Sequence, residues 1–455
     1  MSEQAAEAEQ PDIKSARLSA EQYARNFSDM HPPLGATAAL VEADRCYFCY
    51  DAPCTEACPT GIDVAGFINM IKSGNNFGAA RLILQENIVG GSCARVCPTE
   101  TLCEQACVRN DQDHRPVSIG LLQRHAVDAA MAAGQQFFSR APDSGKTVAI
   151  VGAGPAGLSC AHGLARRGHQ VTIFEAREKS GGLNEYGLAT YKMLDNFAVR
   201  EIDYIVAIGG IEIRHGQRLG EDFDLADLQR QFDAVFLGIG LDAVNRLGLA
   251  GEDADGVISA VDYISEIRQC LDLAELPVGR RALVIGGGMT AIDIATQVKL
   301  LGAEEVTLVY RRGPEAMPAS MEEQEFCQIK GVKIRYNAIP VRIHTTGGHV
   351  SSVEFARSQS AADGSLNNTG EGFSLPADML FTAIGQKFNA GIDPPLAFEN
   401  GRIQVDAERK ASVSGVWAGG DCIGNGADLT VAAAQDGKLA AKSINAFLQS
   451  SGNEE

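Results

Sequence analysis

Eight of the twelve cysteines in this 455-residue chain lie between positions 46 and 107. They form two groups of four, which are Cys46, Cys49, Cys54 and Cys58, and then Cys93, Cys97, Cys103 and Cys107. The acidic start, MSEQAAEAEQ, is unlike an export signal, and disulfides do not persist in a reducing compartment. Thiolates at this density therefore indicate iron–sulfur clusters or zinc. The spacings lack the paired CxxC arms of a tetrahedral zinc site, which favours clusters.

A glycine-rich turn follows the cysteines. Thr147–Val151 reads as a strand, a helix is predicted over 158–167, and an acidic residue ends the next strand, 171–174. Such a turn brings backbone N–H groups to a pyrophosphate at a helix N-terminus, and the acidic residue accepts hydrogen bonds from an adenosine ribose. The residues expected to bind this first dinucleotide, FAD, are Gly152, Gly154, Pro155, Ala156, Gly157 and Glu175.

A second glycine-rich turn lies between a strand at 282–285 and a helix predicted over 292–301. The following strand, 306–310, ends in two arginines where an acidic residue is usual. Guanidinium groups there suit a 2′-phosphate, which favours NADPH over NADH, although paired arginines also pack on an adenine face. The expected nicotinamide-site residues are Gly286, Gly288, Met289, Thr290, Ala291, Arg311 and Arg312.

Near the C-terminus, a strand at 413–417 leads into Gly-Gly-Asp and a helix predicted over 431–447. This pattern suits a flavin, whose ribityl chain the carboxylate can reach. The remaining expected FAD residues are Gly182, Leu183, Lys192, Gly420, Asp421 and Thr430. Two further strand ends, 236–240 and 381–385, mark the crossings where one dinucleotide domain interrupts the other. The second crossing adds Ala383, Ile384 and Gly385 to the nicotinamide site.

These patterns predict a multidomain α+β fold in which an N-terminal helical domain precedes two Rossmann-like domains. From residue 147 onward, strands and helices alternate as in parallel βαβ units. The expected boundaries are 1–40 for a tail or arm, 41–140 for the helical cysteine domain, 141–243 with 386–455 for a split FAD domain, and 244–385 for the inserted NAD(P) domain.

Composition narrows the functional classes. The net charge of −19 argues against nucleic acid as a partner, because the chain has no basic patch to neutralise phosphates. No apolar run approaches the roughly 20 residues that span a bilayer, so no membrane association is expected. These features predict a soluble, cytoplasmic protein.

Residues 147–447 resemble the flavoproteins with two dinucleotide domains, the class that contains glutathione and thioredoxin reductases. Members of that class usually carry a redox-active cysteine pair near the flavin. Here the remaining cysteines are isolated in sequence and are expected to be packed or incidental thiols; they are Cys160, Cys270, Cys327 and Cys422. Electrons must then leave the flavin by another route, which the N-terminal cysteines can provide.

The cysteine-rich segment is similar to the N-terminal domain shared by the glutamate synthase small chain and dihydropyrimidine dehydrogenase. That resemblance implies two [4Fe–4S] clusters. For the first cluster it implies the ligands Cys46, Cys49, Cys54 and Cys107. For the second it implies Cys58, Cys97, Cys103 and Gln123, with Cys93 left as a bystander.

The segment 181–192 contains the run Asn-Glu-Tyr-Gly followed by Tyr-Lys. It looks more like the flavoprotein subunit of bacterial dihydropyrimidine dehydrogenase than like the glutamate synthase chain. This resemblance implies an enzyme, an NAD(P)H-dependent oxidoreductase, that passes electrons from NAD(P)H through FAD and the clusters. The acceptor would be an FMN- and iron–sulfur-containing partner that reduces uracil or thymine, in a hetero-oligomer that we expect to be a heterotetramer. Because the chain stops at Glu455, the pyrimidine site is expected on that second polypeptide. The alternatives are a glutamate synthase small chain, or a related electron-transfer subunit, and a non-catalytic redox sensor.

Overall fold

The computed structural model describes residues 18–361, 365–388, 396–424 and 426–451. Within these ranges the chain forms two compact units. The larger unit comprises 29–185, 192–243 and the described part of 387–455. The inserted unit comprises the described part of 1–28 together with 186–191 and 244–386. The helical cysteine-bearing segment is therefore part of the same unit as the first glycine-rich turn.

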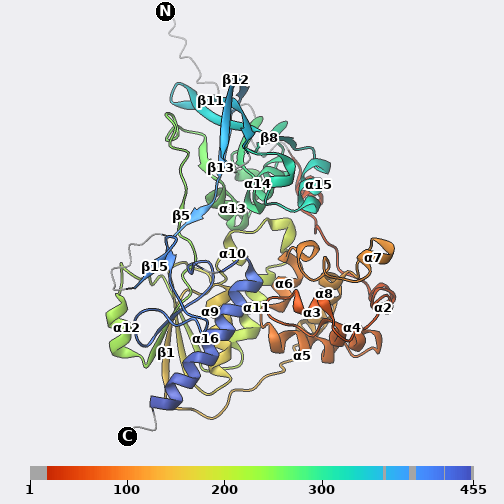
Figure 1. Cartoon of the computed structure of the whole chain (residues 1–455), viewed down its shortest axis with the longest axis vertical. Helices are drawn as coiled ribbons and strands as arrows, with labels where there is room; N and C mark the ends of the chain where they lie inside the picture. Colours follow the sequence, from red (N-terminus) through yellow and green to blue (C-terminus); the bar gives the residue numbers. More distant parts are fainter. Residues whose placement is uncertain (1–17, 362–364, 389–395, 425, 452–455) are drawn as a thin grey trace, which may run out of the picture. The chain divides into compact units, whose positions relative to one another are not determined.

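The cysteine-bearing segment of the larger unit is built from short helices (Figure 1). Their apolar stripes meet in a core that contains Phe67, Ile71, Ile83 and Leu122, each of which is almost completely buried. The helices are α2 (Ala36–Asp44), α3 (Pro53–Glu56), α4 (Val64–Lys72), α5 (Asn76–Glu86), α6 (Gly90–Val96), α7 (Asn110–Asp113) and α8 (Ile119–Ala132), with a 3-10 turn at Thr99–Thr101.

A five-stranded parallel sheet forms the rest of the larger unit, in the order β17–β4–β1–β2–β3. The strands are β1 (Thr147–Val151), β2 (Gln170–Glu175), β3 (Ile211–His215), β4 (Ala234–Leu237) and β17 (Val416–Ala418). The accompanying helices are α9 (Pro155–Ala165), α11 (Phe197–Val206), α12 (Leu225–Gln231) and α16 (Thr430–Ser451). Strands from both halves of this interrupted region thus share one sheet.

The helices α9 and α16 pack closely against each other. The Ser159 hydroxyl donates a hydrogen bond to the Ala434 carbonyl over 2.7 Å. At Gly437, an added Cβ would lie only 2.1 Å from the Ala156 carbonyl oxygen, so glycine permits this approach of the two backbones. Helix α9 also begins at Pro155, three residues before the helix predicted from sequence, because proline suits the first helical position and Gly154 caps it.

The inserted unit has its own five-stranded parallel sheet, in the order β6–β13–β7–β8–β9. Its strands are β6 (Val257–Ser259), β7 (Arg281–Gly286), β8 (Glu305–Val309), β9 (Lys333–Arg335) and β13 (Met379–Ala383). Its helices include α1 (Ala20–Asn26), α13 (Ala260–Gln269), α14 (Met289–Leu300) and α15 (Met321–Ile329). Helix α1 lies within the region expected to be a tail or arm, and the Asn26 side chain donates to the Leu300 carbonyl.

An antiparallel sheet interrupts the expected series of parallel units. It consists of β10 (Ala338–Thr346), β11 (His349–Ser360) and β12 (Leu366–Pro376). The turn between β10 and β11 contains Gly347 and Gly348, both with positive φ, as a tight hairpin requires. Predicting only parallel βαβ units was therefore wrong for residues 338–376.

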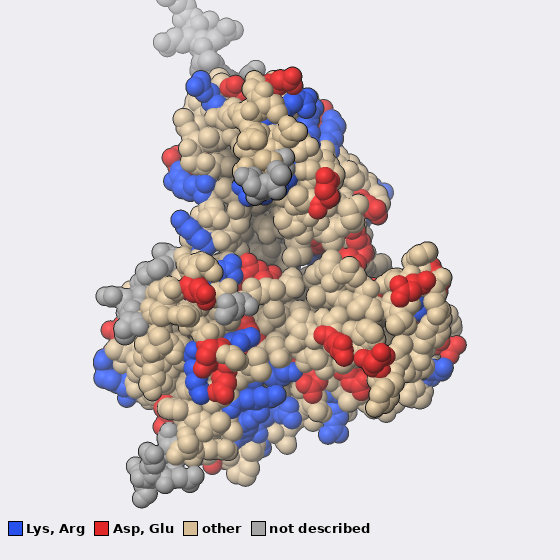
Figure 2. Space-filling model, viewed as in Figure 1, with Lys and Arg blue, Asp and Glu red and all other residues tan. Residues whose placement is uncertain are grey.

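The remaining short elements are α10 (Leu183–Tyr186), β5 (Ala243–Val244), β14 (Gln386–Lys387), β15 (Phe398–Glu399) and β16 (Arg402–Ile403), with 3-10 turns at Thr190–Lys192, Leu273–Glu275 and Pro314–Ala316. Within the described ranges, no helix has both the length and the apolar character needed to cross a membrane. Figure 2 shows acidic side chains gathered over the helical segment near α3 and α8.

Replacing Gly437 by alanine is expected to lower the free energy of unfolding of the larger unit by about 1–3 kcal/mol, because the new methyl group would clash with the α9 backbone. The matched control is Gly35→Ala, where nothing lies within 4 Å of an added Cβ and φ is −67°. We expect that control to change stability by less than about 0.5 kcal/mol. Urea unfolding of both variants measures the difference, and equal midpoints would contradict the close packing.

Candidate functional site

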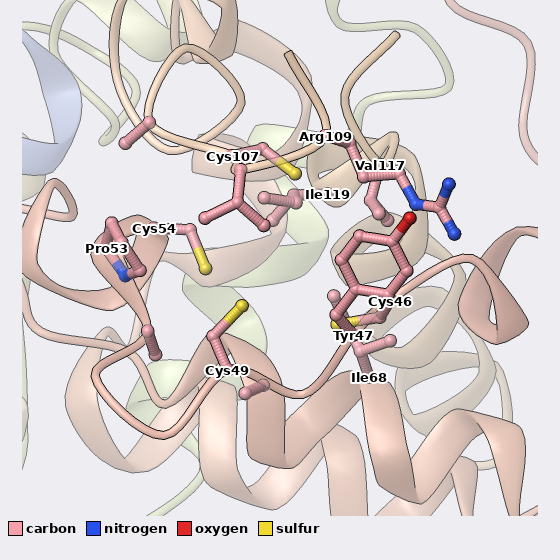
Figure 3. A pocket seen from close by; sticks show the side chains of 14 residues that line it. Cys46, Tyr47, Cys49, Pro53, Cys54, Ile68, Cys107, Arg109, Val117 and Ile119 are labelled. Carbon is pink, nitrogen blue, oxygen red and sulfur yellow. The ribbon is translucent and has the colours of Figure 1, made fainter. Parts of the chain in front are cut away.

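Four cysteines from separate parts of the helical segment surround one pocket. Figure 3 shows the side chains of Cys46, Cys49, Cys54 and Cys107 around a shared space. Apolar groups that include Ile68, Val117 and Ile119 line the same pocket. We call these four cysteines the first thiol set. They are the four ligands implied for the first cluster, so the fold brings together residues as far apart in sequence as 46 and 107.

The loop that carries this set has an unusual backbone. Phe48 has φ of 52° and Ala52 has φ of 31°, in the left-handed region that non-glycine residues rarely adopt. These two turns allow the chain to place Cys46, Cys49 and Cys54 around the pocket within nine residues. Such strain persists only where the surrounding structure enforces it, and it is frequent at functional sites.

Two thiols of the first set, Cys46 and Cys54, are poorly suited to exist as free thiolates. Burial, followed by the charges of Cys46 and Cys107, raises the pKa of Cys54 to about 12. Burial also raises the pKa of Cys46, although the backbone N–H of Phe48 partly opposes the shift. Several thiolates in one buried space repel one another unless a cation neutralises them, and a metal centre deprotonates its thiol ligands. The donor set therefore fits a metal-containing group.

The four thiols of the first set can be compared with the ligand sets of known metal centres. Zinc binds four ligands in a tight tetrahedron with Zn–S distances of about 2.3 Å. Among the residues that the structure describes, no three Cys, His, Asp or Glu side chains converge in a way that could hold one metal ion. Four cysteine thiols around one pocket match the ligand set of an iron–sulfur cluster, which is held by cysteine thiolates.

A second thiol set lies beside the first and comprises Cys58, Cys93, Cys97 and Cys103. A hydrogen bond with Cys93 is the main cause that raises the pKa of Cys97, followed by burial and then by the nearby charges of Cys93, Cys103 and Cys58. Burial, followed by Glu104, Cys58 and Cys54, raises the pKa of Cys103. Because Cys54 belongs to the first set, the two sets are neighbours, as electron transfer between them would require.

The position of Gln123 bears on the second set. This residue is buried on α8, and its Nε2 donates a hydrogen bond to the Gly90 carbonyl over 2.6 Å. The amide oxygen thus remains available as a ligand atom. Cys93, which the sequence interpretation leaves as a bystander, lies one turn after Gly90 on α6 and contacts Cys97. Both Gln123 and Cys93 are therefore candidates for the fourth ligand.

The first glycine-rich turn forms an open cradle. Gly152 has φ of 98°, and an added Cβ on Gly157 would lie 2.0 Å from the Gly152 carbonyl oxygen. At Gly154 the space is open, with only the Cα of Gly182 within 4 Å of an added Cβ. Glycine thus fixes the turn at two positions and leaves room for a phosphate at the start of α9. Pro155 and Ala156 form the first turn of that helix.

Glu175, at the end of β2, is buried and holds the neighbouring loops. Its Oε2 accepts a hydrogen bond from the Ala153 N–H and its Oε1 accepts one from the Arg177 N–H, both over 2.8 Å. Each carboxylate oxygen keeps a lone pair for a further donor. The residue expected to bind a ribose is therefore held in position by the same turn that would receive the pyrophosphate.

Asp421 follows Gly420 in a loop that carries several carboxylates. Burial, followed by the charge of Asp428, raises the pKa of Asp421 to about 6, while Arg402 opposes the shift and Asp436 adds to it. Asp436 is fully engaged, because it accepts hydrogen bonds from the Gly420 N–H and from Arg409 Nε. Asp421 makes no hydrogen bond within the described ranges, which suits a carboxylate that awaits donors from a ligand.

Asn184, in the part of the segment 181–192 that belongs to the larger unit, contacts the start of α16. The Thr430 hydroxyl donates to Asn184 Oδ1 over 2.9 Å, within the larger unit. Gly182 has φ of 55° and precedes Leu183, the first residue of α10. Lys192 ends a 3-10 turn. Asn184 was not among the residues that sequence reasoning selected, although its polar side chain inside a glycine-rich loop was a usable signal.

The second glycine-rich turn, in the inserted unit, resembles the first: one glycine makes a close backbone contact and another leaves open space. An added Cβ on Gly286 would lie 2.3 Å from the Ala383 carbonyl oxygen, whereas nothing lies within 4 Å at Gly288, the N-cap of α14. Met289, Thr290 and Ala291 form the first helical turn. The space at Gly288 and the unsatisfied N–H groups of that turn are suited to a phosphate.

Two features frame this second site. Neither the Arg311 nor the Arg312 side chain has an ion-pair or hydrogen-bond partner among the described residues, so both guanidinium groups can pair with a ligand. On the returning strand, the Gly385 carbonyl accepts from the Asn245 N–H over 3.0 Å and the Ile384 carbonyl accepts from Asn245 Nδ2 over 3.3 Å. Asn245 therefore joins the two points at which the chain enters and leaves the inserted unit.

The isolated cysteines carry no sign of a redox-active pair. Burial raises the pKa of Cys327 to about 11 and that of Cys422 to about 12. Burial also raises the pKa of Cys160. Cys270 donates to the Asp272 carbonyl. Buried, protonated thiols are poor nucleophiles, so the surroundings of Cys160, Cys327 and Cys422 disfavour thiol chemistry. That all four isolated cysteines are incidental stays a prediction.

Sequence reasoning missed the residues that fasten the cysteine helices to the dinucleotide sheet. Glu201 on α11 is buried and accepts hydrogen bonds from the Gly91 and Ser92 N–H groups, over 2.8 and 3.0 Å, and from the Ser92 hydroxyl. Burial raises the pKa of Glu201 to about 7, although these donors and Arg95 oppose the shift. Lys438 on α16 donates to the Thr60 carbonyl over 2.7 Å. Thr60 Oγ1 in turn lies 3.3 Å from the Cys58 sulfur.

Comparison with known proteins gives two family matches. Residues 23–135 match the model described as dihydropyrimidine dehydrogenase domain II, 4Fe-4S cluster. Residues 146–437 match pyridine nucleotide-disulphide oxidoreductase. These matches support an iron–sulfur domain followed by a flavin- and nicotinamide-binding domain.

Among curated proteins, the chain is 33% identical to the glutamate synthase [NADPH] small chain of Escherichia coli, over 93% of this chain and 94% of the relative. It is also 33% identical to the NAD-dependent dihydropyrimidine dehydrogenase subunit PreT of Salmonella typhimurium, over 93% of this chain and 98% of the relative. A third relative is the NADP(+)-dependent formate dehydrogenase subunit beta of Moorella thermoacetica, which is 34% identical over 91% of this chain and 62% of the relative.

Solved structures show the same fold at low identity. FprA of Mycobacterium tuberculosis in complex with NADPH matches with a TM-score of 0.59 and 19% identity, over 69% of this chain and 86% of that chain. Thioredoxin reductase of T. acidophilum matches with a TM-score of 0.54 and 22% identity, over 66% of this chain and 99% of that chain.

Asp421→Asn is expected to act in opposite directions on stability and on flavin binding. A carboxyl group whose pKa rises from 3.8 to about 6 on folding stabilises the fold fully below about pH 4, and this contribution is lost as the pH rises through 6. Asparagine carries no charge, so it avoids the cost of a buried, ionised carboxylate. Without flavin, the variant should therefore be more stable than wild type by about 1–2 kcal/mol at pH 7.5 and equally stable near pH 4. FAD should bind about tenfold more weakly, because the charged acceptor is lost.

Urea unfolding at the two pH values and fluorescence titration with FAD measure these effects. The control is Asp111→Asn, which replaces an exposed carboxylate on α7. Loss of stability in the Asp421 variant at pH 7.5 would contradict the assignment of a ligand-directed carboxylate.

Proposed function

Because the chain belongs to the pyridine nucleotide-disulphide oxidoreductase family and carries an iron–sulfur domain before it, we propose that it is the electron-input subunit of a dihydropyrimidine dehydrogenase. It takes electrons from NAD(P)H and delivers them to an FMN- and iron–sulfur-containing subunit that reduces uracil or thymine to the 5,6-dihydropyrimidine. The two subunits form a hetero-oligomer, which we propose is a heterotetramer. The observation that carries the proposal is that both thiol sets share one compact unit with the FAD cradle.

The chain's own residues bind and position the cofactors. The turn at 152–157, Glu175 and Asp421 hold FAD, and the turn at 286–291 with Arg311 and Arg312 holds NAD(P)H. FAD supplies the ability to accept two electrons together and release them singly, which one-electron [4Fe–4S] centres require. The thiol sets and Gln123 bind two such clusters.

The Asn-Glu-Tyr-Gly segment favours the dehydrogenase over the glutamate synthase small chain. Asn184 in that segment accepts a hydrogen bond from Thr430, so the residue that distinguishes the two families lies beside the start of α16. The second candidate function is nevertheless specific, because the small chain is equally identical and almost fully covered. Anaerobic co-purification separates the two, since the first predicts an FMN-containing partner and the second a large amidotransferase.

The test of the proposed function is stopped-flow mixing of the anaerobic protein with NADH or NADPH. We expect rapid bleaching of the flavin absorbance, followed by dihydrouracil formation only when the FMN-containing subunit and uracil are both present. A protein that keeps FAD but shows no bleaching would support the redox-sensor alternative. Bleaching without pyrimidine reduction, together with glutamate formation by an amidotransferase partner, would favour the second candidate.

Iron analysis tests the ligand assignment. The wild-type chain should contain about eight irons with matching acid-labile sulfide and no stoichiometric zinc, as two [4Fe–4S] clusters require. Cys58→Ser should lose about four irons, whereas Cys93→Ser should retain about eight. Gln123→Cys should keep both clusters but shift the potential of one, because a thiolate adds negative charge.

Gln123→Leu provides the matched comparison to Cys93→Ser. If Gln123→Leu keeps about eight irons while Cys93→Ser loses about four, Cys93 is the fourth ligand and the assignment of Gln123 is wrong. Redox titration followed by EPR reads the potentials and the spin state of each remaining cluster.

The cofactor preference rests on the two unpaired guanidinium groups. Arg311→Gln with Arg312→Gln should raise the KM for NADPH about tenfold or more, because each lost pair with a 2′-phosphate costs about 1–2 kcal/mol. The KM for NADH should change less than about twofold. Steady-state reduction of ferricyanide with each nucleotide measures both values. An equal loss with both nucleotides would indicate that the arginines pack on the adenine instead.

A further inference from the structure

Exposed apolar side chains concentrate in a short stretch of sequence that includes two cysteines of the first thiol set. Of the ten large apolar residues that are exposed in the described part of the chain, four lie within residues 40–50. These are Leu40 at 45%, Val41 at 64%, Tyr47 at 47% and Tyr50 at 106% relative exposure. Exposed apolar residues scattered singly need no explanation, but a concentration of them marks interaction surfaces. We call this stretch the 40–50 segment.

The 40–50 segment is continuous with the pocket of the first thiol set. It contains Cys46 and Cys49, whose side chains line the pocket in Figure 3. Tyr47 is fixed beside them, because its hydroxyl donates to Gln112 Oε1 over 2.6 Å and its ring lies 4.1 Å from the Arg109 guanidinium. Tyr50 follows Cys49 directly and is fully exposed. A partner seated on these side chains would therefore lie next to the first cluster.

The charges around the segment are unbalanced. Each nearby cation already has a carboxylate partner: Lys72 with Asp44, Arg45 with Glu42, Arg109 with Asp113 and Arg115 with Glu42. In contrast, the exposed carboxylates of Asp51, Glu56 and Asp111 have no ion pair or hydrogen bond within the ranges that the structure describes. Figure 2 shows this acidic character over the helical segment. The remaining charge is negative, so a complementary partner is basic.

We propose that the 40–50 segment, rimmed by Asp51, Glu56 and Asp111, is the docking surface for a basic, apolar-centred face of the electron-accepting subunit. The inference rests on the proposed function, which it deepens by naming the surface through which electrons leave the chain. Apolar and aromatic side chains supply the centre of the contact, and the unpaired carboxylates supply the rim. One-electron transfer between the cluster on this chain and an acceptor on the partner needs only that the two be held close.

The experiment uses the complete chain with both clusters and FAD, and the purified FMN- and iron–sulfur-containing catalytic subunit as the probe. The apolar variant is Val41→Ser with Tyr50→Ser, and the charge variant is Asp51→Lys with Glu56→Lys. The matched control is Leu271→Ser, which removes an equally exposed apolar side chain, at 105%, from the inserted unit. Isothermal titration calorimetry gives the Kd, and NADH-driven ferricyanide reduction reports the cofactors without the partner.

Both test variants should weaken the Kd for the catalytic subunit at least tenfold and slow pyrimidine reduction correspondingly. Iron content and ferricyanide reduction should remain within about twofold of wild type, and Leu271→Ser should match wild type in every assay. Raised salt should weaken binding by the wild-type chain more than by the charge variant, because the rim contributes by electrostatic attraction.

Unchanged affinity in both test variants would overturn the proposal. So would self-association of the wild-type chain that these variants abolish, because the surface would then join two copies of the chain. The proposed function fails separately: in that case neither NADH nor NADPH reduces the flavin or ferricyanide in the wild-type protein. Normal ferricyanide reduction without any binding of the catalytic subunit would overturn the identity of the partner and this docking surface, while leaving the redox activity intact.

Discussion

The contact between the cysteine helices and the dinucleotide sheet is the constraint on which the larger unit depends. Burial raises the pKa of Glu201 to about 7, yet its carboxylate accepts hydrogen bonds from three donors at the start of α6. The Arg95 guanidinium lies 3.5 Å from the centroid of the Phe197 ring on the same face and pairs with Asp128. Because Cys93 and Cys97 lie on or directly after α6, these anchors also fix the second thiol set. Leaving a buried carboxylate without hydrogen-bond donors costs more free energy than its hydrogen bonds contribute to stability. The fold therefore depends on keeping all three donors beside Glu201.

Burial of the thiols gives the sites their chemical character. Free thiols in these surroundings stay protonated, since desolvation and neighbouring sulfurs both disfavour the charged form. Only a strongly cationic group reverses that preference, so a metal-containing group that binds these thiols must displace their protons. The same reasoning applies to Asp421, whose raised pKa reflects a carboxylate placed for donors that the protein does not provide. Above its pKa, the Asp421 carboxylate carries an electrostatic cost in the free chain, whereas the protonated thiols are neutral and do not.

Local signals predicted much of this arrangement. The glycine-rich turns, the strands beside them and the acidic residue at position 175 are determined by neighbouring residues, so their sequence spacing was sufficient. The antiparallel sheet of 338–376 was missed because one glycine pair, Gly347 and Gly348, was its main signal in a polar stretch. Glu201 and Lys438 were missed for a different reason: each acts across more than a hundred residues of sequence, and nothing near them in the chain marks the partner. The roles of Gln123 and Cys93 depend on a three-dimensional choice that spacing alone does not make.

The distribution of charge would separate the two kinds of partner that the proposed function requires, a dinucleotide and an electron-accepting protein. A net charge of −19 repels an anionic dinucleotide over most of the surface, so binding requires local positive charge that no carboxylate neutralises. Arg311 and Arg312 meet that requirement in the inserted unit. Around the 40–50 segment the situation is reversed, because the four nearby cations are already paired while three carboxylates have no ion pair among the described residues. The same acidic composition therefore disfavours a dinucleotide beside the first thiol set and suits the basic partner face that we propose there. Pairing within the chain, rather than net charge, decides which partner each surface attracts.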